Sequence, residues 1–289
     1  MVKVLKYLGV FIAWNLVAGM ALMLTPPPVA FVIALLLFLW LLGGYLLYPE
    51  GGNRRRWADI RIRPLRGPAL RWSLAAAPVA LLLSWSITDL YTRLVPVPEE
   101  SLNPFGEMLT TPADRLLITF FAIGIAPVAE EFFFRGLIQH NLERLFRRWF
   151  GDRYGARSGR RLGVAAGITV AAAIFSAVHA LPWVFPVYLF LGMAFGFMVW
   201  VTESIWAGVL LHAVNNVAAT LSMAAPGGET PDSGTLLETG AASDLWPGVI
   251  SLLVTGTLAF WIGRQLVRLR SQRRHPASLP TDSGPAYLP

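Results

Sequence analysis

The stretch 29–48, VAFVIALLLFLWLLGGYLLY, contains no charged residue and is long enough to cross a membrane as a helix. A bilayer core of ~30 Å requires about 20 apolar residues in an α-helix. Seven further blocks have a similar length and character. The full set lies at residues 4–24, 29–48, 72–92, 116–140, 162–181, 183–201, 204–223 and 246–263. The sequence therefore predicts an all-α, polytopic transmembrane helix bundle of about eight spans.

The composition supports a membrane protein and argues against a nucleic-acid-binding one. Hydrophobic residues make up 55% of the chain and charged residues 14%, whereas a soluble domain is about 25% charged. The net charge of +7 comes from cations in short segments between the apolar blocks, so we expect no nucleic-acid partner. Cysteine is absent, which excludes disulfides and thiolate metal sites.

The distribution of cations predicts the orientation of the chain. The N-terminus, the segments 49–71 and 141–161 and the tail from Arg264 contain 21 of the 24 lysines and arginines. Cytoplasmic loops of membrane proteins retain such an excess of cations. With eight spans, both termini are then expected in the cytoplasm. The preference for arginine over lysine is compatible with the inner membrane of a bacterium.

The chain between the blocks leaves no room for a soluble domain. We expect a single membrane-embedded domain over residues 1–270 and a flexible polar tail over 271–289. The small and polar segment 227–242 is also expected to be mobile. The first block resembles a signal peptide, but its apolar stretch is too long for one, so we expect it to be a retained first helix.

Three charged residues lie inside the fourth block, in the sequence AEEFFFRG at 129–136. Each charge within a span costs about 2.5 to 3.5 kcal/mol on insertion scales, so these three require a reason. Glu131 and Arg135 are four residues apart on one helix face, which favours an ion pair between them. Glu130 lies ~100° around the helix from Glu131. We therefore expect Glu130 to be the freer carboxylate.

Two of the four histidines also lie within apolar blocks. His179 ends the sequence FSAVH, and His212 begins HAVNN, in which Asn216 shares its helix face. Imidazole can orient or deprotonate a water, and imidazole with a carboxamide can donate hydrogen bonds to an oxyanion. A single such residue is more typical of a polar contact between transmembrane helices. The combination over three spans favours catalysis.

The strings EEFFFR (130–135), FSAVH (175–179) and HAVNN (212–216) resemble, in this order, the EExxxR, FxxxH and HxxxN motifs of the CPBP family. That family comprises CAAX prenyl proteases of the Rce1 type and bacteriocin-processing or self-immunity proteins. The motif-bearing core covers about residues 115–223. The resemblance implies an endopeptidase that hydrolyses a peptide bond in a membrane-associated protein or peptide.

The resemblance also implies a role for each polar residue of the motifs. The roles are water activation for Glu130 with His179, a supporting ion pair for Glu131 with Arg135, and oxyanion stabilisation for His212 with Asn216. Members of the family are often called metalloproteases, and Glu130, His179 and His212 could instead bind a divalent ion such as zinc. The sequence lacks the HExxH motif of zinc proteases, and we favour metal-free general-base catalysis.

One alternative function and one geometric difficulty oppose this interpretation. A proton-coupled transporter or a scaffold could use the same residues as a relay, since intramembrane acids and histidines also transfer protons. A relay, however, has no use for an amide beside a histidine. In addition, a fifth span that began at Leu162 would place His179 about 10 Å from the level of Glu130, at 1.5 Å per residue.

Overall fold

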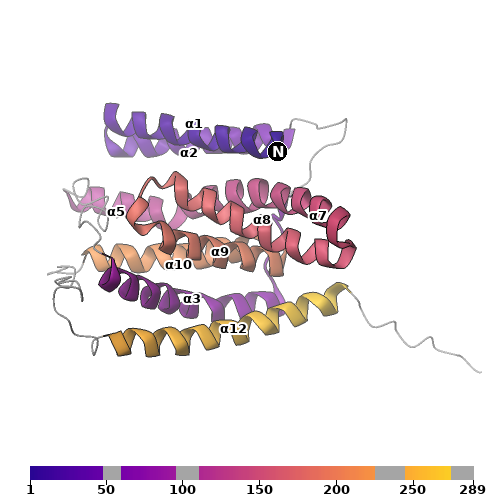
Figure 1. Ribbon diagram of the computed structural model, residues 1–289. Helices are drawn as coiled ribbons and strands as arrows, with labels where there is room; N and C mark the ends of the chain where they lie inside the picture. Colours follow the sequence, from indigo (N-terminus) through magenta and orange to yellow (C-terminus); the bar gives the residue numbers. More distant parts are fainter. Residues whose placement is uncertain (48–59, 96–110, 225–244, 275–289) are drawn as a thin grey trace, which may run out of the picture.

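The computed structural model describes residues 1–47, 60–95, 111–224 and 245–274, and every regular element in these parts of the chain is a helix (Figure 1). The long helices run roughly parallel or antiparallel to one another in a single bundle. The predicted all-α fold is therefore confirmed.

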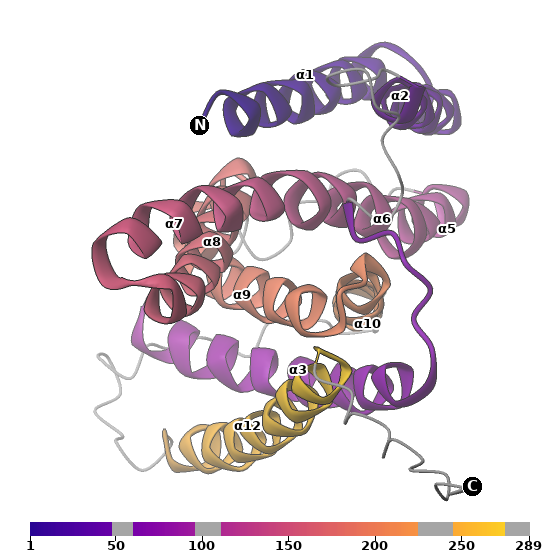
Figure 2. The same cartoon turned by 90° about the vertical axis from the view of Figure 1, so that its right-hand side faces the viewer.

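The first two helices, α1 (Val2–Leu24) and α2 (Pro27–Leu47), form a hairpin on one side of the bundle (Figures 1 and 2). Helix α1 ends because Thr25 has an extended backbone and because prolines follow it. The indole Nε1 of Trp14 donates a hydrogen bond of 3.0 Å to the carbonyl of Ala34, which joins the two helices.

The fourth apolar block forms one continuous helical run whose character changes along its length. Its parts are α5 (Pro112–Phe120), the π-helix η3 (Phe121–Ile125), α6 (Ala126–Glu131), the π-helix η4 (Phe132–Gln139) and α7 (His140–Tyr154). The α1–α2 hairpin packs against η4, where the ring centroids of Phe11 and Phe134 are 4.8 Å apart. The run passes through the centre of the bundle and carries both glutamates of the first motif.

Helix α8 (Ala156–Val178) turns back against α7 and lies unusually close to it. Gly155, with φ of +80°, forms the turn in a conformation that favours glycine. Gly159, Gly163 and Gly167 then recur at every turn of α8, each facing the backbone of the preceding helix. A Cβ at Gly163 would come within 2.5 Å of the backbone nitrogen of Arg147. These glycines therefore fix both the closeness and the register of the pair.

Four helices complete the bundle. They are α3 (Gly67–Leu94), α9 (Phe185–Thr202), which the short 3₁₀ turn η5 (Pro182–Val184) precedes, α10 (Ile205–Ala224) and α12 (Trp246–Arg274). Helices α3 and α12 lie side by side and pack against α9 and α10, on the side away from the α1–α2 hairpin (Figures 1 and 2). A second apolar core forms between these four helices.

The structure supports a membrane-spanning bundle. Six helices within the described residues are long and apolar enough to cross a membrane, and α10 contains a shorter apolar segment, Ile205–Thr220. The start of α1, the α7–α8 turn and the end of α12 lie at the same end of the bundle, so the cation-rich segments gather there (Figure 1). Helix α12 runs to Arg274; the predicted mobile segment 227–242 and the rest of the predicted polar tail lie outside the described residues.

Candidate active site

Glu131 and Arg135 form the expected ion pair at the centre of the bundle. Arg135 Nε lies 3.2 Å from Glu131 Oε2, and both side chains are fully buried. The guanidinium also lies over the ring of Phe175, 4.9 Å from its centroid, in a cation–π contact. Gly208 of α10 faces the carboxylate, and a Cβ at this position would collide with Glu131 Oε2. A glycine at 208 is therefore needed for Glu131 to fit.

His212 of α10 bridges the two glutamates. Its Nδ1 is 3.4 Å from Glu131 Oε1, and its Nε2 is 3.8 Å from Glu130 Oε2. His212 follows Gly208 by one helical turn, so both residues face α6. Phe195 of α9 stacks on the imidazole with ring centroids 4.9 Å apart, which restricts rotation of the ring.

His179, which follows the last residue of α8, also approaches Glu130. Its Nε2 lies 3.9 Å from Glu130 Oε2, while its Nδ1 is 2.6 Å from the carbonyl of Phe175. A carbonyl only accepts hydrogen bonds, so Nδ1 carries the proton and donates it to Phe175. Tyr188 of α9 stacks on the imidazole of His179 with ring centroids 4.7 Å apart, and Phe175 contacts the same imidazole edge to face. The Nε2 atom of His179 is thereby directed at Glu130.

Glu130 is the point on which the two histidines converge. Its Oε2 is buried and has no hydrogen-bond partner among the described residues. Distances of 3.8 and 3.9 Å to the two Nε2 atoms are too long for direct hydrogen bonds and are typical of groups that a water bridges. The side chain retains 18% of its exposure, whereas Glu131 retains none. Glu130 is thus the freer of the two carboxylates, as expected.

The expected difference in depth between Glu130 and His179 is wrong. It assumed that the fifth span begins at Leu162, where the apolar block begins, but α8 begins at Ala156 directly after the turn at Gly155. Glu131 precedes Gly155 by as many residues as His179 follows it. In an antiparallel helix pair, residues equidistant from the turn lie at the same level, so His179 meets the two glutamates.

Asn216 makes a contact that the sequence analysis did not predict. Its Nδ2 donates a hydrogen bond of 2.8 Å to the carbonyl of Ala122 in η3. In this π-helix the N–H of residue i+5 bonds to the carbonyl of residue i, as Ala126 does to Phe121. The corresponding donor for Ala122 would be residue 127, which is a proline without an N–H. Asn216 therefore replaces a backbone hydrogen bond that Pro127 removes.

A bound metal ion requires several side chains that converge on one point. Within the described residues, no three His, Asp or Glu side chains are disposed so that they could hold a metal ion together. The alternative in which Glu130, His179 and His212 bind zinc, and with it the metalloprotease class, has no support in this geometry.

The motif residues thus lie on α6, η4, the end of α8 and α10, within a segment that matches a known family. Residues 112–218 match the family model of the Rce1-like type II CAAX prenyl endopeptidases. These residues form an Rce1-like domain. No match was found among curated proteins or among solved structures.

The Rce1-like domain extends from α5 to α10 and contains all six predicted site residues. Its family is one of proteases, so the match favours a peptidase over a proton-coupled transporter or a scaffold. Three further residues of the Rce1-like domain contribute to the site and were not predicted from the sequence. They are Tyr188 and Phe195, which stack on the histidines, and Gly208, which makes room for Glu131.

Proposed function

We propose that the Rce1-like domain is an intramembrane endopeptidase in which Glu130 is the general base. The observation that carries this proposal is the convergence of two imidazole Nε2 atoms, at 3.8 and 3.9 Å, on a buried carboxylate oxygen without another hydrogen-bond partner among the described residues. A water between these groups would be held by the histidines while Glu130 takes its proton. The hydroxide formed then attacks the carbonyl carbon of the substrate's peptide bond, and Glu130 passes the proton to the leaving amine.

His179 acts as the orienting partner of this water. The hydrogen bond from its Nδ1 to the carbonyl of Phe175 leaves the lone pair of Nε2 to accept from the water. Tyr188 and Phe175 contact the imidazole from two directions, which supports a fixed orientation of the ring. A ring that is already held in one orientation loses little conformational freedom when the transition state forms, which favours the orienting role.

Glu130 is supported by a series of polar contacts that links Arg135, Glu131 and His212. Arg135 holds Glu131, and Glu131 accepts from Nδ1 of His212, which leaves Nε2 of His212 toward the reacting groups. When that nitrogen carries a proton, it can donate a hydrogen bond to the negative charge that develops on the substrate oxygen. The full burial of the Glu131–Arg135 pair suits a supporting role, because no water can reach it.

Asn216 completes the proposed oxyanion site. One N–H of its amide is engaged by the carbonyl of Ala122, and the same amide has a second N–H with which it can donate. The bond to Ala122 fixes the orientation of the amide before a substrate binds. Such preorganised donors account for a large part of catalysis in acyl-transfer enzymes.

The substrate that we propose is a peptide or protein embedded in the same membrane. The site lies on α6, η4, α10 and the end of α8, in a bundle in which six helices within the described residues are long and apolar enough to span a bilayer, and this setting favours a substrate that reaches the site from the membrane. We further propose the inner membrane of a bacterium as its location, with which the preference for arginine over lysine in the connecting segments is compatible.

Cleavage is best tested with a single isosteric substitution. Membranes that contain the wild-type chain should yield new peptide termini in proteome-wide peptide mapping, and membranes that contain Glu130→Gln should not, because an amide cannot take a proton from water. Asp89→Asn is the control and should give the same new termini as the wild type, since Asp89 is a half-exposed carboxylate of α3 that pairs with Arg93 at 2.9 Å outside the site. The same new termini with Glu130→Gln at equal expression would refute the assignment of the base.

A further inference from the structure

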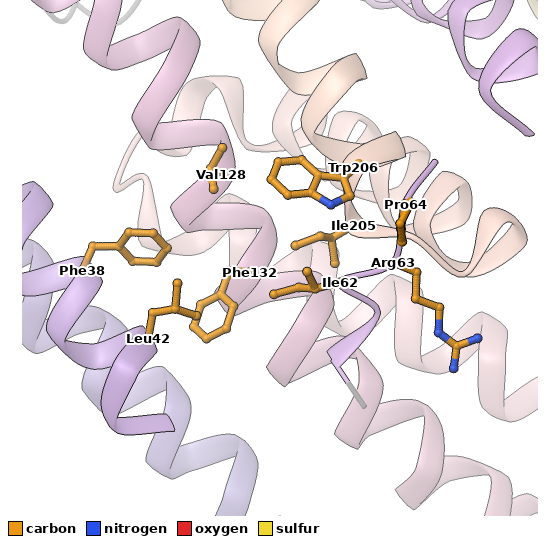
Figure 3. Close-up of a pocket in the computed structure, with 9 residues that line it drawn as sticks. All are labelled: Phe38, Leu42, Ile62, Arg63, Pro64, Val128, Phe132, Ile205 and Trp206. Atoms are coloured by element: carbon orange, nitrogen blue, oxygen red, sulfur yellow. The ribbon is translucent and has the colours of Figure 1, made fainter. Parts of the chain in front are cut away.

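An apolar cavity of about 610 Å³ lies between α2 and the helix run that carries the glutamates (Figure 3). Its walls come from α2, from the junction of α6 and η4, from the start of α10 and from residues 62–64. Representative lining residues are Phe38, Leu42, Val128, Phe132, Trp206 and Arg63. Apart from Arg63, every residue that lines it is apolar. Its size is within the range of cavities that bind small molecules.

The cavity lies on the face of α6 opposite to the proposed base. Val128 and Phe132 are four residues apart and share the face toward α2, and the ring of Phe132 packs edge to face on that of Phe38 in the cavity wall, with centroids 5.8 Å apart. Glu130 follows Val128 by two residues, which turns it about 200° around the helix. An occupant of the cavity therefore cannot present a bond to Glu130. The cavity is distinct from the place where a peptide would be cleaved.

The position of the cavity along the membrane normal matches one leaflet. Phe38 lies nine residues before the end of α2 at Leu47, which corresponds to about 14 Å at 1.5 Å per residue. This length is close to half of a hydrocarbon core of ~30 Å. Arg63 belongs to the segment between α2 and α3, at the cation-rich end of the bundle. The cavity thus extends from mid-membrane to the predicted cytoplasmic surface.

Arg63 supplies a positive charge at the edge of the cavity. Figure 3 shows its guanidinium extending away from the apolar side chains. It contacts Glu203 at 3.5 Å, and both side chains are about half exposed, so this ion pair is weak. Arg270 binds the same carboxylate at 2.9 Å. Two arginines share one glutamate, and the local charge is positive.

We propose that this cavity binds an acyl chain of an anionic phospholipid from the cation-rich leaflet, with the lipid phosphate on Arg63. An acyl chain can fill the cavity without burying a polar group, and the phosphate can pair with Arg63 at the polar edge. Basic sites between transmembrane helices at the cytoplasmic surface bind anionic headgroups in this way. The bound lipid would pack against Val128 and Phe132 and so stabilise the helix that carries both glutamates.

The proposal can be tested by native mass spectrometry of the purified full-length chain after exchange into phosphatidylglycerol or phosphatidylcholine. We expect the wild type to retain one phosphatidylglycerol preferentially. Arg63→Gln should lower that retention about fivefold, which corresponds to ~1 kcal/mol for one cation at an anionic lipid. Leu42→Trp, or the milder Leu42→Phe, should also remove the lipid by filling the cavity.

Two matched controls are available on the same elements. Arg66→Gln removes an exposed cation three residues from Arg63, and Leu39→Trp adds the same bulk to α2 at a half-exposed position that does not line the cavity. Both should retain the lipid. Phosphatidylglycerol should also raise the unfolding temperature of the wild type and of the controls more than that of Arg63→Gln.

Four outcomes would overturn the proposal. They are equal retention of phosphatidylcholine, unchanged retention in Arg63→Gln, unchanged retention in both cavity-filling variants while these remain folded, and a co-purified peptide that the filling variants release in place of lipid. Unchanged retention in the filling variants would mean that the lipid binds at another basic surface, such as the segment 141–161.

Discussion

Asn216 donates a hydrogen bond to the Ala122 carbonyl and is proposed to stabilise the oxyanion. Substitution of Pro127 separates these two roles. Asn216→Ala removes the donor to the Ala122 carbonyl, which Pro127 cannot supply. The Ala122 carbonyl is partly buried, and loss of its partner should cost about 1 kcal/mol of folding free energy, the lower end of the range for an unsatisfied buried group. If Asn216 also stabilises the oxyanion, its loss should lower kcat about 10²- to 10³-fold, or ~2.7 to 4 kcal/mol of transition-state stabilisation, with little change in apparent substrate affinity.

The double variant Pro127→Ala/Asn216→Ala restores a backbone N–H that can bond to Ala122. We therefore expect it to recover most of the stability lost by Asn216→Ala, while its kcat remains reduced by the same 10²- to 10³-fold. Unfolding temperature in detergent and initial rates on a cleaved substrate from the peptide mapping give the two readouts. Pro127→Ala alone is the control and should retain near wild-type turnover, because Asn216 is intact.

Each readout can refute one part of this reasoning. Recovery of full turnover in the double variant would mean that Asn216 supports the helix and does not stabilise an oxyanion. Failure to recover stability would mean that the Ala122 carbonyl is not the group that Asn216→Ala leaves unpaired. Asn216→Asp should be at least as damaging to turnover as Asn216→Ala, since an ionised carboxylate repels an oxyanion.

Three further predictions concern the ion pair, the glycine contacts and the orientation. Glu131→Gln and Arg135→Leu should each lower the unfolding free energy by about 3 to 5 kcal/mol, because the remaining partner stays buried and unpaired; a thermal stability equal to wild type would contradict this. Gly163→Val should separate α7 from α8 and reduce both stability and cleavage, and normal cleavage would show that the close approach is not needed. A cysteine at position 158 should be shielded from an impermeant thiol reagent in intact cells and one at 233, outside the described residues, should react; the reverse pattern would invert the orientation.

Hydropathy alone predicts the helices of this chain because each must satisfy its backbone hydrogen bonds within the membrane. The expected block 72–92 became α3 with ends at Gly67 and Leu94, and the other seven blocks also fell on helical segments. The ion pair between Glu131 and Arg135 was also predictable, since their spacing alone puts them on one face.

Other features depend on contacts that no local pattern encodes. Tyr188 is an ordinary apolar position of its block, and only the packing of α9 against α8 places its ring on His179. The π-helices were not predicted, because a shift of hydrogen bonds from i+4 to i+5 has no distinct residue signature. Pro127 was the one available signal, since a proline within a span leaves a carbonyl that a neighbouring helix must satisfy.

The convergence of the first two motifs follows from chain connectivity, which spacing within each motif does not reveal. Gly155 sets the turn, and the glycines at 159, 163 and 167 hold α8 against α7 in a constant register. Continued toward the membrane centre, the same register pairs Arg135 with Phe175 and Glu131 with His179. The contact of Arg135 with the Phe175 ring at 4.9 Å and that of His179 with Glu130 at 3.9 Å agree with it. The position of one glycine turn, outside every motif, therefore determines whether the base and its histidine meet.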